Sequence, residues 1–159
     1  MKLRTRTGKA EAGWSDLQVR RLAHEREFLQ KTFPDFAFFN QRSTSAYVEG
    51  EWTSALGTTY TIRVQLNAAY PVVVPSVYIM DPFPLIGFGG RSMHTYGSSH
   101  LMHTFESDIP SATKVCIVRP ESWDARWFIS NVIRRTLLWI LAYEFHGDDG
   151  TPVYKFLID

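Results

Sequence analysis

The spacing of apolar residues changes along the chain, and each change predicts a different element. Near the start, Ser15 and Gln18 have the three-residue spacing of a helix capping box. Pro34 ends the pattern that follows. We therefore expect an amphipathic helix over about residues 15–33. Its apolar residues recur at near-helical spacing at Val19, Leu22, Leu29 and Phe33, and the residues on or near its solvent-facing side are Arg20, Arg21, Glu25, Arg26 and Glu27.

Short apolar runs separated by turn residues follow between residues 36 and 80. The clearest is 58–66, where the apolar side chains from Tyr60 to Leu66 alternate with polar ones. Proline has no N–H to donate to a neighbouring strand. In the next apolar run, which contains Pro75, we therefore expect only residues 77–80 to pair freely in a sheet. The pattern predicts a meander of four antiparallel strands, at 36–39, 46–53, 58–66 and 77–80.

The last long apolar stretch predicts a core helix that begins with Asp124 as its N-cap and runs to about Phe145. Its apolar residues cover more than one side, as expected for a deeply buried helix, and His146-Gly147 is the expected stop. The segment 81–113, between strands and helix, is rich in glycine and proline and shows little apolar periodicity. We expect a long irregular loop there, of the kind that is often functional.

Composition indicates one globular domain of 159 residues, with 45% hydrophobic residues. We expect residues 13–159 to form the domain and residues 1–12 to be a flexible basic tail, with Lys2, Arg4, Arg6 and Lys9. Lys plus Arg number 17 and Asp plus Glu number 16, so no overall charge favours direct nucleic-acid or membrane binding. No apolar segment reaches the roughly 20 residues of a membrane span, and the basic start lacks the apolar stretch of a secretory signal. A cytoplasmic protein is expected, and its oligomeric state stays open.

Cys116 is the only cysteine, so it cannot form a disulfide within the chain and is either packing or chemistry. It lies where a short strand end, with Val115 and Ile117, gives way to turn residues at 119–122. Lys114 is two residues away, and a nearby cation favours the nucleophilic thiolate. The position therefore suits a reactive thiol on a loop.

The irregular segment contains three histidines, His94, His100 and His103. No cysteine or carboxylate stands at a zinc-site spacing from them, so we predict no metal. A satisfied or solvent-exposed histidine is the default, and a histidine that orients the cysteine loop is the sharper alternative. The chain also has no glycine-rich phosphate loop and no dinucleotide fingerprint, so no nucleotide cofactor is predicted. Any acyl group that reaches Cys116 must arrive already activated.

The order of these features resembles that of the ubiquitin-conjugating enzyme family, over about residues 15–152. Tyr70-Pro71 with Pro75 resembles the family's tyrosine-proline and paired-proline signature, although Val74 replaces the first proline of the pair. Cys116 matches the catalytic cysteine, and Trp123, seven residues later, matches the family tryptophan. The resemblance implies an α+β UBC-like fold, with an N-terminal helix, a four-stranded antiparallel meander, an irregular active-site loop and a C-terminal core helix.

The resemblance also implies roles for individual residues. Cys116 would carry an acyl group as a thioester, and Asp148 falls close to where the family often has an acidic residue beside the cysteine, so it could orient or deprotonate an incoming lysine amine. The eukaryotic His-Pro-Asn motif is missing, asparagine included; His103 or His94 could stand in for its histidine. Backbone N–H groups around Cys116 or a loop histidine must then support the oxyanion.

The run from Trp139 to Glu144 resembles bacterial members of the family, especially those of anti-phage CBASS operons. This implies that the chain carries the C-terminus of a cGAS-like nucleotidyltransferase, or otherwise of a ubiquitin-like protein, and joins it to a target lysine. Two alternatives remain at this point. One is a catalytically silent scaffold subunit of the same fold, and the other is a cysteine hydrolase, for which no recognisable dyad spacing is present.

Overall fold

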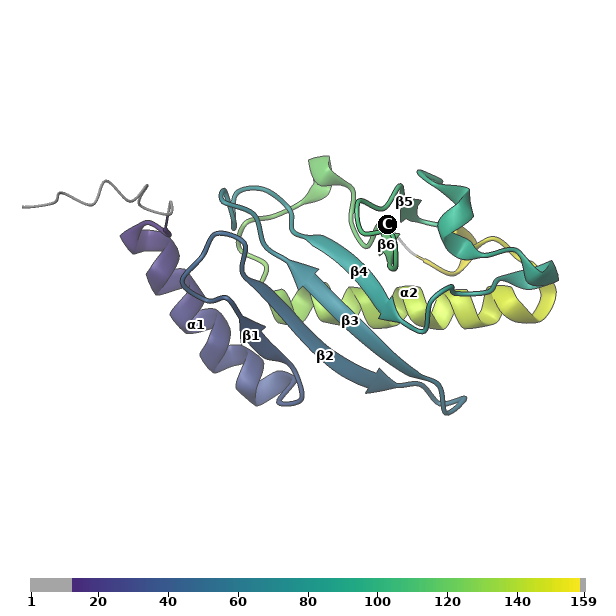
Figure 1. The fold of residues 1–159 in the computed structure, drawn as a ribbon, viewed down its shortest axis with the longest axis horizontal. Helices are drawn as coiled ribbons and strands as arrows, with labels where there is room; N and C mark the ends of the chain where they lie inside the picture. Colours follow the sequence, from purple (N-terminus) through teal and green to yellow (C-terminus); the bar gives the residue numbers. More distant parts are fainter. Residues whose placement is uncertain (1–12, 158–159) are drawn as a thin grey trace, which may run out of the picture.

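The computed structural model describes residues 13–157 and has an antiparallel sheet with a long helix across one face and a shorter helix beside its edge (Figure 1). The predicted basic tail, residues 1–12, lies outside the described residues, as do residues 158 and 159. The elements are α1 (Asp16–Thr32), β1 (Ala37–Phe39), β2 (Tyr47–Thr53), β3 (Thr59–Gln65), β4 (Ser76–Asp81), β5 (Thr104–Phe105), β6 (Thr113–Val115) and α2 (Ile129–Asp149), with short 3-10 helices at η1 (Phe88–Gly90), η2 (Met93–Tyr96), η3 (Pro120–Ser122) and η4 (Val153–Phe156).

The predicted α+β class is confirmed, and the four predicted strands form the meander β1 to β4. The predicted strand number was wrong, because β5 and β6 extend the sheet in the order β1-β2-β3-β4-β6-β5. These two strands have only two and three residues, which is too short for alternation to be visible in the sequence. β4 begins at Ser76, directly after Pro75, as the lack of a proline N–H requires.

The first helix begins as its capping box predicts. The Ser15 hydroxyl accepts a hydrogen bond from the Gln18 N–H at 3.3 Å, and the Gln18 side chain accepts one from the Ser15 N–H at 2.9 Å. The prediction of which residues of this helix are buried and which are exposed was only partly right. Val19 is 52% exposed, whereas Glu25, expected on the solvent side, is only 1% exposed. A charged residue in an apolar position can be buried only when partners compensate its charge.

Those partners come from three separate parts of the chain. The Glu25 carboxylate receives an ion pair from Arg21 at 3.0 Å, a hydrogen bond from the Tyr70 hydroxyl at 2.5 Å and another from the Ile129 N–H at 2.9 Å. The Arg21 guanidinium also donates to the carbonyl oxygens of Ala125 and Trp127, at 2.7 and 2.6 Å. Burial raises the pKa of Glu25 above its usual value, and these hydrogen bonds oppose the rise. The network fixes α1 against the beginning of α2.

Both predicted ends of the second helix were wrong. Asp124 is not its N-cap; it pairs with Arg126 at 2.7 Å, and the helix begins at Ile129, where the Asn131 side chain accepts from the Phe128 N–H at 3.0 Å. The helix also continues past His146-Gly147 to Asp149, and Gly150, with φ 81°, ends it. A glycine inside a helix costs only about 1 kcal/mol. The buried His146 holds these turns through Phe88 N–H and the Thr151 carbonyl.

The segment predicted to be irregular is ordered by buried anchors. Leu85, Met93, Met102 and Ala112 are all buried, and the segment contains η1, η2 and β5. The indole N–H of the fully buried Trp139, on α2, donates to the carbonyl oxygens of Met102 and His103 at 3.1 and 3.0 Å. The loop is therefore held on the core helix. Within the described residues, no helix combines the length and apolar character that a membrane crossing needs.

We expect the Glu25→Ala variant to lose about 3–5 kcal/mol of unfolding free energy, because it leaves the Arg21 charge and the Ile129 N–H without their acceptor. Urea unfolding followed by tryptophan fluorescence measures the loss. Glu27→Ala is the matched control, since Glu27 lies exposed on the same helix and forms an exposed ion pair with Lys31 at 3.6 Å. Its effect should stay below about 0.5 kcal/mol. Equal losses in the two variants would contradict the role of the network.

The raised pKa of Glu25 predicts a pH dependence. A carboxyl with a higher pKa in the folded state binds its proton more tightly there, so the resulting stability is complete below the usual value of 4.5 and is lost as pH rises through the folded-state pKa. The Glu25→Gln variant cannot titrate. The difference in unfolding free energy, wild type minus Glu25→Gln, should therefore fall as pH rises from about 4.5. A difference that rises over this range would contradict the assignment.

Candidate functional site

Cys116 directly follows β6, the strand between β4 and the edge strand β5, and is half-buried. Its N–H donates to the His103 carbonyl oxygen at 2.8 Å. Its thiol donates a 3.5 Å hydrogen bond to the carbonyl oxygen of Val118. Backbone and sulfur are therefore both held by neighbouring main-chain groups where the strand ends.

His103 is the histidine that the structure brings to the cysteine. Its carbonyl oxygen accepts from the Cys116 N–H and from the Trp139 indole, and its backbone has φ 48°, an uncommon value for a residue other than glycine. Its ring is largely buried and packs on that of His100, with 5.3 Å between centroids, and His100 in turn stacks on Tyr154. The strained backbone is held in place by core contacts.

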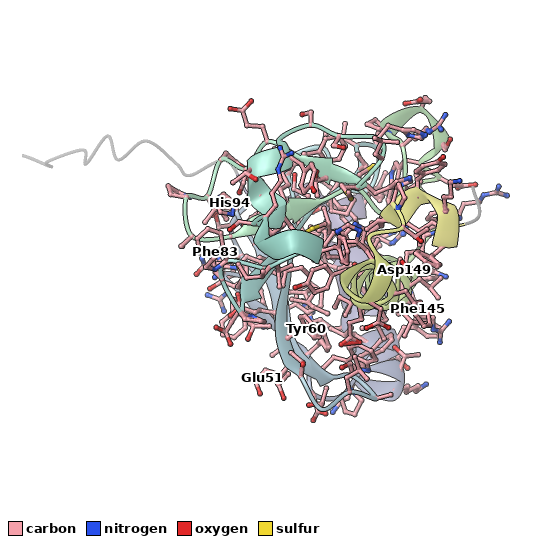
Figure 2. The ribbon with its side chains drawn as sticks, turned by 90° about the vertical axis from the view of Figure 1, so that its right-hand side faces the viewer. Glu51, Tyr60, Phe83, His94, Phe145 and Asp149 are labelled. Atoms are coloured by element: carbon pink, nitrogen blue, oxygen red, sulfur yellow. The ribbon has the colours of Figure 1, made fainter. Side chains whose placement is uncertain are left out.

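The other predicted histidine lies elsewhere. His94, in η2, packs against Phe83 with 4.8 Å between ring centroids, and Figure 2 shows the two together on one side of the molecule. Among residues 13–157, no cluster of three or more His, Cys, Asp or Glu side chains is placed to bind a metal ion. The His94 ring is therefore part of the packing of the active-site loop.

Asp148 lies exposed in the last turn of α2, nine residues beyond Trp139. At 1.5 Å per residue, this places it about 13 Å farther along the helix axis than the residue that contacts the His103 carbonyl. The neighbouring Asp149, labelled in Figure 2, accepts a hydrogen bond from the Thr151 N–H at 2.9 Å, which lowers the pKa of Asp149. A role for Asp148 beside the cysteine stays a prediction.

Lys114, expected to favour the thiolate, contacts other groups. Its ammonium lies 3.6 Å from the Asp108 carboxylate and 5.6 Å from the centre of the Tyr78 ring. The Tyr78 hydroxyl donates to Asp108 at 2.5 Å, and burial, together with that carboxylate, raises the pKa of Tyr78 to about 12. Asp108 therefore partly neutralises the charge of Lys114, which weakens any stabilisation of the Cys116 thiolate by this lysine.

Two cavities are lined by residues that adjoin the cysteine in the chain; Ile117 lines both, and Cys116 itself is not among the lining residues of either. One, of about 280 Å³, is also lined by Val115 and Val118, the residues on either side of the Cys116–Ile117 pair. The other, of about 260 Å³, is lined by His103 and Trp139.

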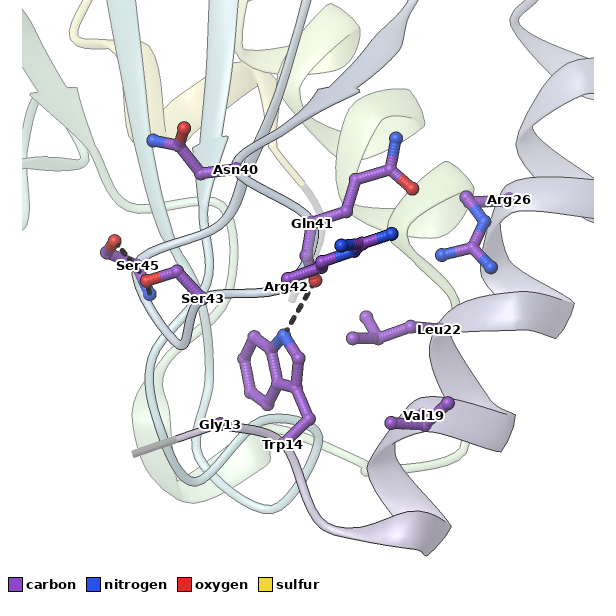
Figure 3. A pocket seen from close by; sticks show the side chains of 10 residues that line it. All are labelled: Gly13, Trp14, Val19, Leu22, Arg26, Asn40, Gln41, Arg42, Ser43 and Ser45. Atoms are coloured by element: carbon purple, nitrogen blue, oxygen red, sulfur yellow. Dashed lines mark hydrogen bonds between the residues drawn. The ribbon is translucent and has the colours of Figure 1, made fainter. Parts of the chain in front are cut away.

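A larger cleft, of about 1130 Å³, is a separate feature between α1 and the loop that follows β1 (Figure 3). Its lining includes Arg26 and Arg42, and the Trp14 indole donates to the Gln41 carbonyl at its floor. Cys116, His103 and Asp148 are not among its lining residues. A choice of functional site by cleft size alone would have favoured this cleft over the surroundings of Cys116.

The family signature residues meet in this arrangement. The Trp123 indole donates to the Pro71 carbonyl at 2.8 Å, and the neighbouring Tyr70 binds Glu25. An antiparallel meander, a cysteine after its added strand, this tryptophan contact and a C-terminal core helix define a ubiquitin-conjugating-enzyme-like protein. The model of the type II CBASS E2 protein family matches residues 25–151, and the chain belongs to that family. The same comparisons found no matching curated protein and no matching solved structure.

Membership in this family gives the chain an E2-like role in CBASS anti-phage defence. The sequence pointed to Cys116 and His103 but missed Trp139 as the residue that holds them together. Trp139 is 36 residues from His103 along the chain, and in the sequence it belongs to an apolar helix and to the run that resembles bacterial family members, neither of which indicates a contact with His103. No local pattern could have shown this contact.

We expect Trp139→Phe to speed hydrogen exchange of the Cys116 amide, because the shared carbonyl of His103 loses one of its two anchors. The variant should also lose at least about 1 kcal/mol of unfolding free energy, since the Met102 carbonyl loses its indole donor. Hydrogen exchange of the Cys116 amide is measured by NMR, under conditions in which this amide exchanges through local opening of the structure and not through global unfolding. Trp52→Phe is the control, because within residues 13–157 the Trp52 indole has no hydrogen-bond partner. Unchanged exchange in Trp139→Phe would contradict the anchoring role.

Proposed function

We propose that this protein carries the C-terminus of a CBASS partner protein as a thioester on Cys116 and transfers it to a target amine. The partner inferred from the family is a cGAS-like nucleotidyltransferase, otherwise a ubiquitin-like protein. The observation that carries the proposal is a half-buried cysteine, held at the end of β6 with cavities lined by its chain neighbours, in a chain of the E2 family. The cytoplasm, where a single thiol stays reduced, is the compartment proposed for this chemistry.

The transfer needs two acyl substitutions. First, the Cys116 thiolate attacks the carbonyl carbon of an activated donor; a bond to Sγ forms, the bond to the donor's leaving group breaks, and the leaving group takes up a proton. Then the amine nitrogen of a lysine attacks the same carbon. A C–N bond forms, the C–Sγ bond breaks, and the thiolate is regenerated as the amine loses its proton.

Support for the oxyanion is proposed to come from the main chain. The Cys116 N–H is already used by the His103 carbonyl. The N–H groups of Ile117 and Val118 donate to no backbone carbonyl among residues 13–157, so they are the available donors next to the sulfur. One such donor is typically worth about a hundred- to a thousandfold in rate. His103 positions the cysteine backbone, and Asp148 is proposed to orient the incoming amine.

The experiment is co-expression with the proteins encoded beside this chain, followed by intact mass analysis of the Cys116→Ser variant. Serine should trap the acyl group as an oxyester, which resists DTT and is cleaved by mild base. The wild type should give a DTT-labile adduct, and Cys116→Ala should give none. If neither the wild type nor Cys116→Ser forms an adduct with any partner, the catalytically silent scaffold becomes the better account.

A further inference from the structure

The 280 Å³ cavity is lined by the residues on both sides of Cys116 in the chain, and Cys116 itself is not among its lining residues. Val115 and Ile117, the chain neighbours of the cysteine, both line it, and so does Val118, whose carbonyl oxygen is 3.5 Å from Sγ. Binding sites for drug-sized molecules typically occupy about 300–1,000 Å³. This smaller space suits one side chain of a polypeptide rather than a whole ligand or a helix.

The walls of the cavity are mainly apolar and come from three segments. Val74 and Pro75 approach from the start of β4, Phe105 comes from β5, and Val118 and Pro120 follow the cysteine. An apolar space recovers free energy when it is filled by an aliphatic side chain, at about 25 cal/mol per Å² removed from water. The preferred occupant is therefore aliphatic.

The charged groups at the cavity balance one another. Lys114 and Glu106 both line it, and Lys114 is already paired with Asp108 at 3.6 Å. The wall at Glu106 is fixed, since its N–H donates to the Ser98 hydroxyl at 3.3 Å. The two lining charges are opposite in sign and sum to zero, so a charged side chain would lose its hydration without meeting a net opposite charge.

The carried protein is the expected occupant of this cavity, because it stays bonded to Sγ for as long as the thioester exists. Once a carbonyl is bonded to Sγ, the residues before it continue away from the sulfur at about 3.3 Å per residue. A side chain one or two residues before the terminal carboxyl can therefore reach walls that begin at the cysteine's own neighbours. An acceptor lysine would instead bring an ammonium group, which this cavity does not favour.

We propose that this cavity is a specificity pocket for one branched aliphatic side chain of the carried protein, one or two residues before the carboxyl group that joins to Cys116. The inference rests on the thioester function proposed above. It adds the substrate class: a C-terminal tail with a branched aliphatic residue near its end. Val74 precedes the cysteine in the chain and Val118 follows it, and both line the pocket. We expect these two side chains to set its size.

Short peptide thioesters of mercaptoethanesulfonate test the pocket without the natural partner. Cys116 Sγ forms a bond to the peptide carbonyl, the bond to the mercaptoethanesulfonate sulfur breaks, and that sulfur leaves with the proton. The peptides end in glycine and carry leucine, phenylalanine, alanine or glutamate one or two residues before it. Intact mass gives the acylation rate. Leucine at one of the two positions should be at least about tenfold faster than alanine or glutamate.

Variants of the pocket wall separate recognition from reactivity. Val74→Phe fills the cavity and should remove the preference for leucine while the alanine peptide keeps its rate. Val73→Phe is the matched control, because Val73 is 47% exposed and does not line the cavity. It should keep the full preference. Val118→Ala enlarges the space and should shift the preference toward phenylalanine, which keeps the test decisive if Val74→Phe does not fold.

The outcomes distinguish the two proposals. If all peptide thioesters acylate the wild type at one rate, the pocket is overturned and the thioester function stands. If none acylates Cys116 while iodoacetamide still alkylates it, the thioester function fails, and the pocket fails with it.

Discussion

The buried carboxylate of Glu25 connects α1, the segment before β4 and the first turn of α2 at one point. Removing a carboxylate from water is costly, and the cost is offset only while all of its donors are in place. The interaction therefore favours a single arrangement in which Arg21, Tyr70 and Ile129 converge. The position of α2 against the sheet depends on this convergence, because Ile129 is its first residue.

The geometry at the cysteine follows from that placement of α2. Trp139 lies ten residues after Ile129, about 15 Å along the helix. Its indole holds the His103 carbonyl, which also holds the Cys116 N–H. A helix is stiff over this length, so the position of its first turn also sets where Trp139 meets the loop. The cysteine is thus positioned by the core rather than by the loop alone.

Local signals in the sequence were sufficient where the structure is local. The capping box of Ser15 and Gln18 and the alternation through Tyr60 both led to the observed elements. Glu25 was misplaced because its partners Tyr70 and Ile129 are 45 and 104 residues away, and the helical period alone put it on the solvent side. Asp124 was misplaced for the opposite reason: its nearest partner is Arg126, and a side chain that pairs locally need not cap a helix.

The missing asparagine of the eukaryotic motif need not leave the oxyanion unsupported. The His103 carbonyl, held by Trp139, takes up the Cys116 N–H and so fixes the backbone at which the next peptide groups begin. The N–H groups of Ile117 and Val118 follow in a segment whose side chains line the cavities. Donors fixed before the reaction cost no reorganisation when negative charge develops. In the proposed transfer, a turn after β6 that the core holds in place would supply the oxyanion donors from the main chain.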